Sequence, residues 1–127
     1  MILCKVSPKE LTSQSREFEV MYVVGAFSKS AWKDGGVYHG DNDTYIFSCN
    51  PKFRNFHSLH TQSSLPNFQY LNSTGTSNRG IGFGGSHKND FRLWFDANEG
   101  NNCFVSKSDS TFEAGELFDE KHSNFRV

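Results

Sequence analysis

The chain has 127 residues, with 13 Lys and Arg against 14 Asp and Glu, so its formal charge is −1. This length predicts a single domain over residues 1–127 with one hydrophobic core, which its 13 phenylalanines make aromatic. The balanced charge argues against a nucleic-acid binder, which normally carries a clustered basic surplus. No apolar run approaches the roughly 20 residues of a membrane-spanning helix. We therefore expect no membrane insertion and a cytoplasmic location, with a nuclear or organelle-associated pool left open.

Regular structure is predicted mainly as short β-strands. Residues 18–27 carry apolar side chains on both faces, which indicates a central strand. Helical periodicity is weak, and only 11–18 and 110–120 favour one or two helical turns. We expect a mainly β (α+β) fold, a β-sandwich of two antiparallel sheets flanked by short helices. The expected strands lie at 2–6, 18–27, 44–48, 53–59, 68–71, 79–83, 91–95 and 103–106.

A glycine-rich run, Gly80-Ile81-Gly82-Phe83-Gly84-Gly85, satisfies the G-x-G-x-x-G pattern of dinucleotide-binding proteins. That pattern requires a strand before it and a helix after it. Here a turn and another strand follow, so we predict no nucleotide or other cofactor. Glycine instead permits close packing of a sheet beneath large aromatic side chains.

Metal binding is not favoured by the spacing of the candidate ligands. A calcium loop starting at Asp41 would require Gly at its sixth position and Glu at its twelfth, and these are Ile46 and Lys52. The histidines of His57-Ser58-Leu59-His60 would point to opposite faces of a strand, so they are poorly placed to share one zinc ion.

The cysteines Cys4, Cys49 and Cys103 are odd in number and widely separated, which indicates reduced thiols rather than a disulfide framework. No local signature of a nucleophile accompanies them, and we predict no catalytic residues. Cys103 is nevertheless kept as a candidate redox thiol.

Short aromatic and glycine-containing motifs follow one another along the chain. In order they are Gly25-Ala26-Phe27, Trp32-Lys33, Tyr38-His39-Gly40, Thr44-Tyr45-Ile46-Phe47, Pro51, Phe68-Gln69-Tyr70, Ile81-Gly82-Phe83-Gly84-Gly85, Phe91-Arg92-Leu93-Trp94-Phe95-Asp96, Cys103 and Thr111-Phe112. This ordered series resembles the TLDc domain family. The motif residues to which we assign a structural role are Gly25, Phe27, Trp32, Tyr38, Gly40, Phe47, Gly82, Gly84, Gly85, Leu93, Trp94, Asp96 and Phe112. Of these, Phe27, Trp32, Phe47, Trp94 and Phe112, together with Phe83, are expected in the core, with the two tryptophans in one cluster.

Some departures from the family pattern are visible. The helices that open the family's domain have no counterpart here, and Asn42 replaces the second Gly of its Tyr-x-Gly-x-Gly motif. After a segment like Phe125-Arg126-Val127 the family usually continues into another strand. We therefore expect a domain shortened at both ends, with an unpaired sheet edge near Phe125 that another chain could cover.

The resemblance implies a non-enzymatic protein-interaction module. TLDc proteins are associated with protection against oxidative stress and with binding and regulating the vacuolar-type proton-pumping ATPase (V-ATPase). For this chain we expect contact with the peripheral stalk and catalytic head of that pump. The expected contact loops are 32–43 and 99–109, since loops on a rigid sandwich commonly carry recognition. The alternative function is a thiol-based redox enzyme or sensor that uses Cys103 or Cys49. The sequence leaves the oligomeric state open.

Overall fold

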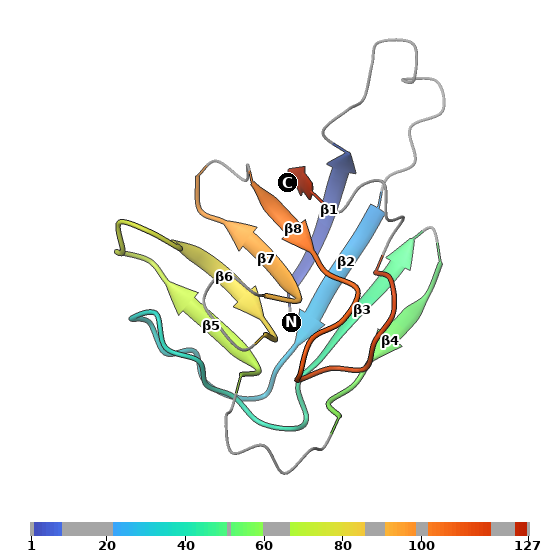
Figure 1. Cartoon of the computed structure of the whole chain (residues 1–127), viewed down its shortest axis with the longest axis horizontal. Helices are drawn as coiled ribbons and strands as arrows, with labels where there is room; N and C mark the ends of the chain where they lie inside the picture. The colour runs from blue at the N-terminus through green and yellow to red at the C-terminus, as the bar shows by residue number, and fades with distance from the viewer. Residues whose placement is uncertain are drawn as a thin grey trace.

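The computed structural model describes residues 2–8, 22–50, 52–59, 67–85, 91–98, 102–117 and 124–126 (Figure 1). These residues form nine strands and no helix. Each expected strand overlaps an observed one, which confirms the mainly β prediction. The helix expected at 110–120 is wrong over 110–117, where the backbone forms bends and one bridge, and 11–18 lies outside the described residues. The strands are β1 (Ile2–Pro8), β2 (Tyr22–Phe27), β3 (Tyr45–Asn50), β4 (Arg54–Phe56), β5 (Gln69–Asn72), β6 (Gly80–Phe83), β7 (Leu93–Asp96), β8 (Cys103–Val105) and β9 (Asn124–Arg126).

Two antiparallel sheets share the first strand. The strand order is β4-β3-β2-β1-β9-β8-β7-β6-β5. Residues Ile2 to Val6 of β1 pair with β2, whereas Ser7 and Pro8 pair with β9. The β2–β4 strands and the β5–β8 strands consequently lie to either side of β1 (Figure 1). This arrangement confirms the expected β-sandwich class.

The main core lies between the two sheets. Strands β2 and β3 contribute Val24, Ala26 and Ile46, and the second sheet contributes Phe83, Leu93, Phe95, Cys103, Val105 and Phe125. A smaller aromatic cluster of Tyr70, Phe91 and Trp94 packs with Tyr38 and Phe104. Both faces of the second sheet are therefore covered by apolar side chains, as in a strand layer buried on two sides.

Both outer edges of the strand order are covered by loops of the same chain. The outer edge of β5 accepts a hydrogen bond from Gly36 N at Leu71 O, 2.9 Å. Beyond β4, Leu59 N donates to Thr111 O, also at 2.9 Å. The expected unpaired edge near Phe125 is wrong, because β9 lies between β1 and β8 and Phe125 is fully buried. Loops that cover edge strands prevent unwanted pairing with other chains.

The expected core placements are confirmed for Phe47, Phe83, Trp94 and Phe112, which are buried, whereas Phe27 is half-buried. Trp32 is the exception, since 40% of its surface is exposed. Its indole approaches Phe83 from a loop, while Trp94 stacks on Phe91 in the smaller cluster. The prediction that the two tryptophans share one cluster is therefore wrong.

Candidate functional site

The connection between β2 and β3, residues 28–44, is here called the 28–44 loop. Its two ends are tied together: Lys29 Nζ lies 2.6 Å from Asp43 Oδ2, and Ser30 Oγ donates to Asp41 Oδ2 at 2.8 Å. The hydrogen bond that Lys29 donates to Asp43 raises the pKa of Lys29. These contacts close the loop at its base.

The middle of the 28–44 loop is fixed on β5. His39 and Gln69 exchange two backbone hydrogen bonds of 2.9 Å. Asp34 accepts hydrogen bonds from the backbone N–H of Ser73 at 2.9 Å and from the Ser73 hydroxyl. The Ser73 hydroxyl hydrogen bond is the main reason that the pKa of Asp34 is lowered. The loop thus pairs with β5 along the outer edge of the sheet.

Side chains of the Tyr38-His39-Gly40 motif hold the loop from within. Lys33 N donates to His39 Nε2 at 3.0 Å, so Nδ1 carries the proton of the neutral ring and faces Val37 O at 3.0 Å. The Tyr38 hydroxyl donates to Gly84 O at 3.0 Å. Gly40 has φ +109°, and a Cβ there would lie 2.9 Å from the Cβ of Phe68. The motif therefore encodes the loop's geometry.

Two apolar side chains of the immobilised loop remain open to solvent. Trp32 packs edge-on against Phe83 and His39, with ring centroids 5.8 and 5.9 Å away, and its remaining surface is free. Val37 is 66% exposed. A tryptophan held by a rigid support offers large contact area at low entropic cost, which is typical of protein-interaction hot spots. This surface lies within the loop 32–43, whose contact role stays a prediction.

The other expected contact loop, 99–109, contains a structural carboxylate. Asp109 has only 1% of its side-chain surface exposed and accepts a hydrogen bond from Arg92 Nη1 at 3.0 Å. It also accepts from the backbone N–H of Gly85 at 2.9 Å and of Thr111 at 3.0 Å. Residues 99–101 lie outside the described part. The side chain of Asp109, the last residue of this loop, faces inward, and the contact role of the loop stays a prediction.

The partner of Asp109 was not singled out by the sequence. Arg92 is fully buried, donates from Nη2 to Gly115 O at 2.7 Å and lies 5.0 Å from the centre of the Phe56 ring. Burial lowers the pKa of Arg92, and the hydrogen bond and charge of Asp109 oppose that shift. The burial of Arg92 could have been predicted from its position within the apolar run Phe91-Arg92-Leu93-Trp94-Phe95.

The glycine-rich run itself forms β6 and its end, rather than a turn between a strand and a helix. Gly82 lies opposite Trp94, and a Cβ at Gly82 would overlap the ring of Phe91. A Cβ at Gly84 would press on Arg92 and Asp109. Gly84 and Gly85 also have positive φ values of 75° and 95°. The close-packing interpretation of this run is thereby supported.

The thiols differ in their access to solvent. Cys103 is fully buried, and its Sγ accepts a hydrogen bond from Asp96 N at 3.4 Å. Cys49 is exposed on β3.

In the described residues no three His, Cys, Asp or Glu side chains cluster as metal ligands, and His60 lies outside those residues.

The remaining motif residues lie in the strands. Gly25 of β2 is opposite Leu3 and Phe47, and Phe27 stacks on Tyr45 at 5.3 Å. Leu93 is in the main core. Asp96 ends β7 and accepts hydrogen bonds from Trp94 Nε1 and Asn98 N. The contacts of these motif residues are therefore strand pairing, side-chain packing and turn hydrogen bonds.

Comparison with known proteins identifies the family of this chain. The family model of the TLDc domain matches residues 13–127, so the chain belongs to the TLDc family. The chain is also similar to MTOR-associated protein MEAK7 of Mus musculus, with 34% identity over 97 residues. The aligned region covers 71% of this chain and 20% of that protein, so the chain spans about a fifth of the relative's length. The part of the chain that the structure describes contains no helix able to span a membrane.

Proposed function

We propose that this chain is a non-enzymatic TLDc module that acts by protein contact in the cytoplasm. Its partner is the V-ATPase, whose assembly or activity it regulates, and through this regulation it protects against oxidative stress. Family membership supports the choice of partner. The observation that carries the mode of action is the partly exposed Trp32 on the immobilised 28–44 loop.

A second candidate partner comes from the relative. MEAK7 of Mus musculus is named as MTOR-associated, and its aligned region is 34% identical to this chain. Association with an MTOR-containing complex would use the same kind of contact surface. The same variants therefore test both partners.

The redox alternative receives unequal support from the two described thiols. A sensing cysteine must meet its oxidant, and the full burial of Cys103 denies it that access. The alternative function consequently depends on Cys49.

The decisive experiment measures binding of the purified chain to purified V-ATPase, together with ATP hydrolysis. Trp32→Ala should weaken binding by about tenfold or more, because a hot-spot tryptophan contributes at least that much. Phe53→Ala is the matched control, since Phe53 is an aromatic residue outside this loop that is 65% exposed. It should bind as the unmodified chain does.

Two results would contradict the proposal. If the folded chain neither binds the pump nor changes its ATP hydrolysis, the partner is wrong. If Trp32→Ala and Phe53→Ala bind equally well, the 28–44 loop is not the contact surface. Circular dichroism of each variant excludes loss of fold as the cause.

A further inference from the structure

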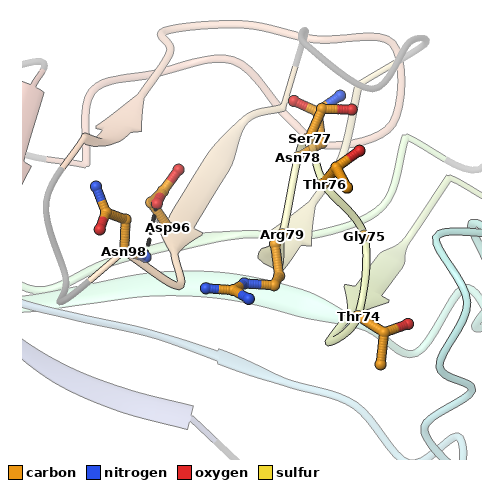
Figure 2. A pocket seen from close by; sticks show the side chains of 8 residues that line it. All are labelled: Thr74, Gly75, Thr76, Ser77, Asn78, Arg79, Asp96 and Asn98. Carbon is orange, nitrogen blue, oxygen red and sulfur yellow. Dashed lines mark hydrogen bonds between the residues drawn. The ribbon is translucent and has the colours of Figure 1, made fainter.

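A polar pocket lies beside the β5–β6 turn, outside the 28–44 loop. It has a volume of about 520 Å³ and is formed by two turns that β6 and β7 bring together (Figure 2). The lining residues are Thr74, Gly75, Thr76, Ser77, Asn78, Arg79, Asp96 and Asn98. Hydroxyl, amide and guanidinium groups therefore dominate its surface, in contrast to the mostly apolar pockets that take drug-like molecules.

The first wall, the β5–β6 turn, is held in shape from within. Asn72 Oδ1 accepts a hydrogen bond from Gly75 N at 2.9 Å, and Asn72 Nδ2 lies 3.4 Å from Ser77 O. The buried Tyr70 donates its hydroxyl to Asn78 O at 3.3 Å. These internal contacts use backbone groups of the turn. The side chains of the turn that line the pocket are therefore not needed to maintain the shape of the turn.

The second wall is the turn after β7. Asp96 accepts hydrogen bonds at Oδ1 from Asn98 N, 2.8 Å, and at Oδ2 from Trp94 Nε1, 3.3 Å. Ala97 N donates to Arg79 O at 2.9 Å, which joins the two walls. Both carboxylate oxygens of Asp96 are thus engaged in building the pocket.

Arg79 supplies the cationic group of the pocket. Figure 2 shows its guanidinium extending away from Thr74, toward the side of Asp96 and Asn98. In the described ranges, the ion pairs are Lys29–Asp43 and Arg92–Asp109, and Arg79 takes part in neither. The side chain is exposed. A guanidinium between two prebuilt walls can donate two parallel hydrogen bonds to a planar anion.

The charge of the pocket selects among anions. The carboxylate of Asp96 lies in the same pocket and offsets part of the charge of the Arg79 guanidinium, so a phosphate dianion is disfavoured more than a monoanion. A single carboxylate matches the Arg79 fork in charge and in planar geometry. The surrounding hydroxyls and amides can bond the main chain that carries it.

We propose that this pocket binds the carboxylate of a Glu or Asp side chain presented by a partner polypeptide, with Arg79 as the bidentate donor. The inference rests on the proposed function in one respect, that the chain acts by protein contact, and it adds the chemistry of the partner. It does not depend on which protein the partner is.

The test is an NMR titration of the whole ¹⁵N-labelled chain with the peptide acetyl-Gly-Glu-Gly-amide. A single ion pair at a surface contributes little free energy, so binding on the order of millimolar is expected. The amide signals of Ser77, Asn78 and Asn98 and the Nε–H of Arg79 should shift. Acetyl-Gly-Gln-Gly-amide, which has the same shape and no charge, should bind about tenfold more weakly or not at all.

Variants assign the effect to the guanidinium. Arg79→Gln should abolish the shifts, and Arg79→Lys should weaken binding by about fivefold because an ammonium lacks the planar fork. Lys52→Gln, which removes an exposed cation in the turn between β3 and β4, should change nothing. The spectra themselves show whether each variant is folded.

Several outcomes would overturn the inference. They are equal binding of the Glu and Gln peptides, unchanged binding by Arg79→Gln, or tighter binding of acetyl-Gly-Gly-Gly with a free C-terminus or of inorganic phosphate. Failure of the peptide titration with intact pump binding overturns this inference alone. Intact peptide binding with no pump binding overturns the proposed partner alone.

Discussion

The guanidinium of Arg92 lies 3.0 Å from the carboxylate of Asp109, and both side chains are closed off from solvent. The carboxylate of Asp109 also accepts hydrogen bonds from the backbone N–H groups of Gly85 and Thr111. The pair therefore fastens the end of β6, the start of β7 and the 109–115 segment to one another. Gly84 makes this approach feasible, because a side chain there would press on both charged residues.

Asp109→Ala should destabilise the chain strongly. Removal of one member of a buried ion pair leaves the other charge without compensation, which costs about 3–5 kcal/mol. Urea unfolding followed by circular dichroism measures the change in the free energy of unfolding. The control is Lys29→Gln, because the Lys29–Asp43 pair is 62% exposed on both sides and should matter little. Equal effects of the two substitutions would show that Asp109 does not organise this region.

Truncation of the two tryptophans to alanine should affect the stability of the fold to very different extents. Trp94 is 3% exposed and stacks on Phe91 with centroids 4.5 Å apart, so Trp94→Ala should cost about 3–5 kcal/mol and unfold most of the protein. Trp32→Ala should keep a cooperative thermal transition, since much of that side chain already contacts water. A soluble, cooperatively folding Trp94→Ala protein would contradict the core placement of Trp94.

The strands could be predicted because each long enough segment combines β-branched and aromatic residues between turn-forming ones. β9 was missed because Asn124-Phe125-Arg126 has a single apolar residue, and its strand geometry comes from pairing with β1 and β8. The helix expected at 110–120 rested on the spacing of Phe112 and Leu117. Both are buried although the segment consists of bends and a single bridge, in which Phe112 pairs with Ser58.

The candidate sites depend on contacts between distant parts of the sequence. The contact loop 32–43 could be inferred from its composition, but the exposure of Trp32 depends on Phe83, far along the chain. The pocket of Arg79 exists only because β6 pairs with β7 and brings two turns together. No local pattern contains that information. Arg92 was missed for the same reason, as its partner lies in a separate loop.

The cysteines should differ in reactivity toward a thiol reagent. Cys49 is exposed and should be labelled in the folded protein. Cys103 should react only on unfolding, because its sulfur has no access to solvent. Iodoacetamide labelling with peptide mass spectrometry, in native buffer and in urea, assigns the reaction to each residue. Rapid native labelling of Cys103 would restore it as a redox candidate. Persistent labelling of Cys49 well below pH 8.5 would favour the redox alternative over a purely structural thiol.

The last prediction concerns acid and the contact between the 28–44 loop and β5. The hydroxyl and backbone N–H of Ser73 bond to the carboxylate of Asp34 and lower its pKa in the folded state. A carboxylate with a lowered pKa stabilises the fold fully above its ordinary pKa, and this contribution disappears as the pH falls through the lowered value. Ser73→Ala should raise the pKa of Asp34 toward its ordinary value, while Ser77→Ala in the same turn should not. Carbon-detected NMR titration of the Asp34 carboxyl group measures both, and an unchanged pKa in Ser73→Ala would show that this hydroxyl does not anchor the loop.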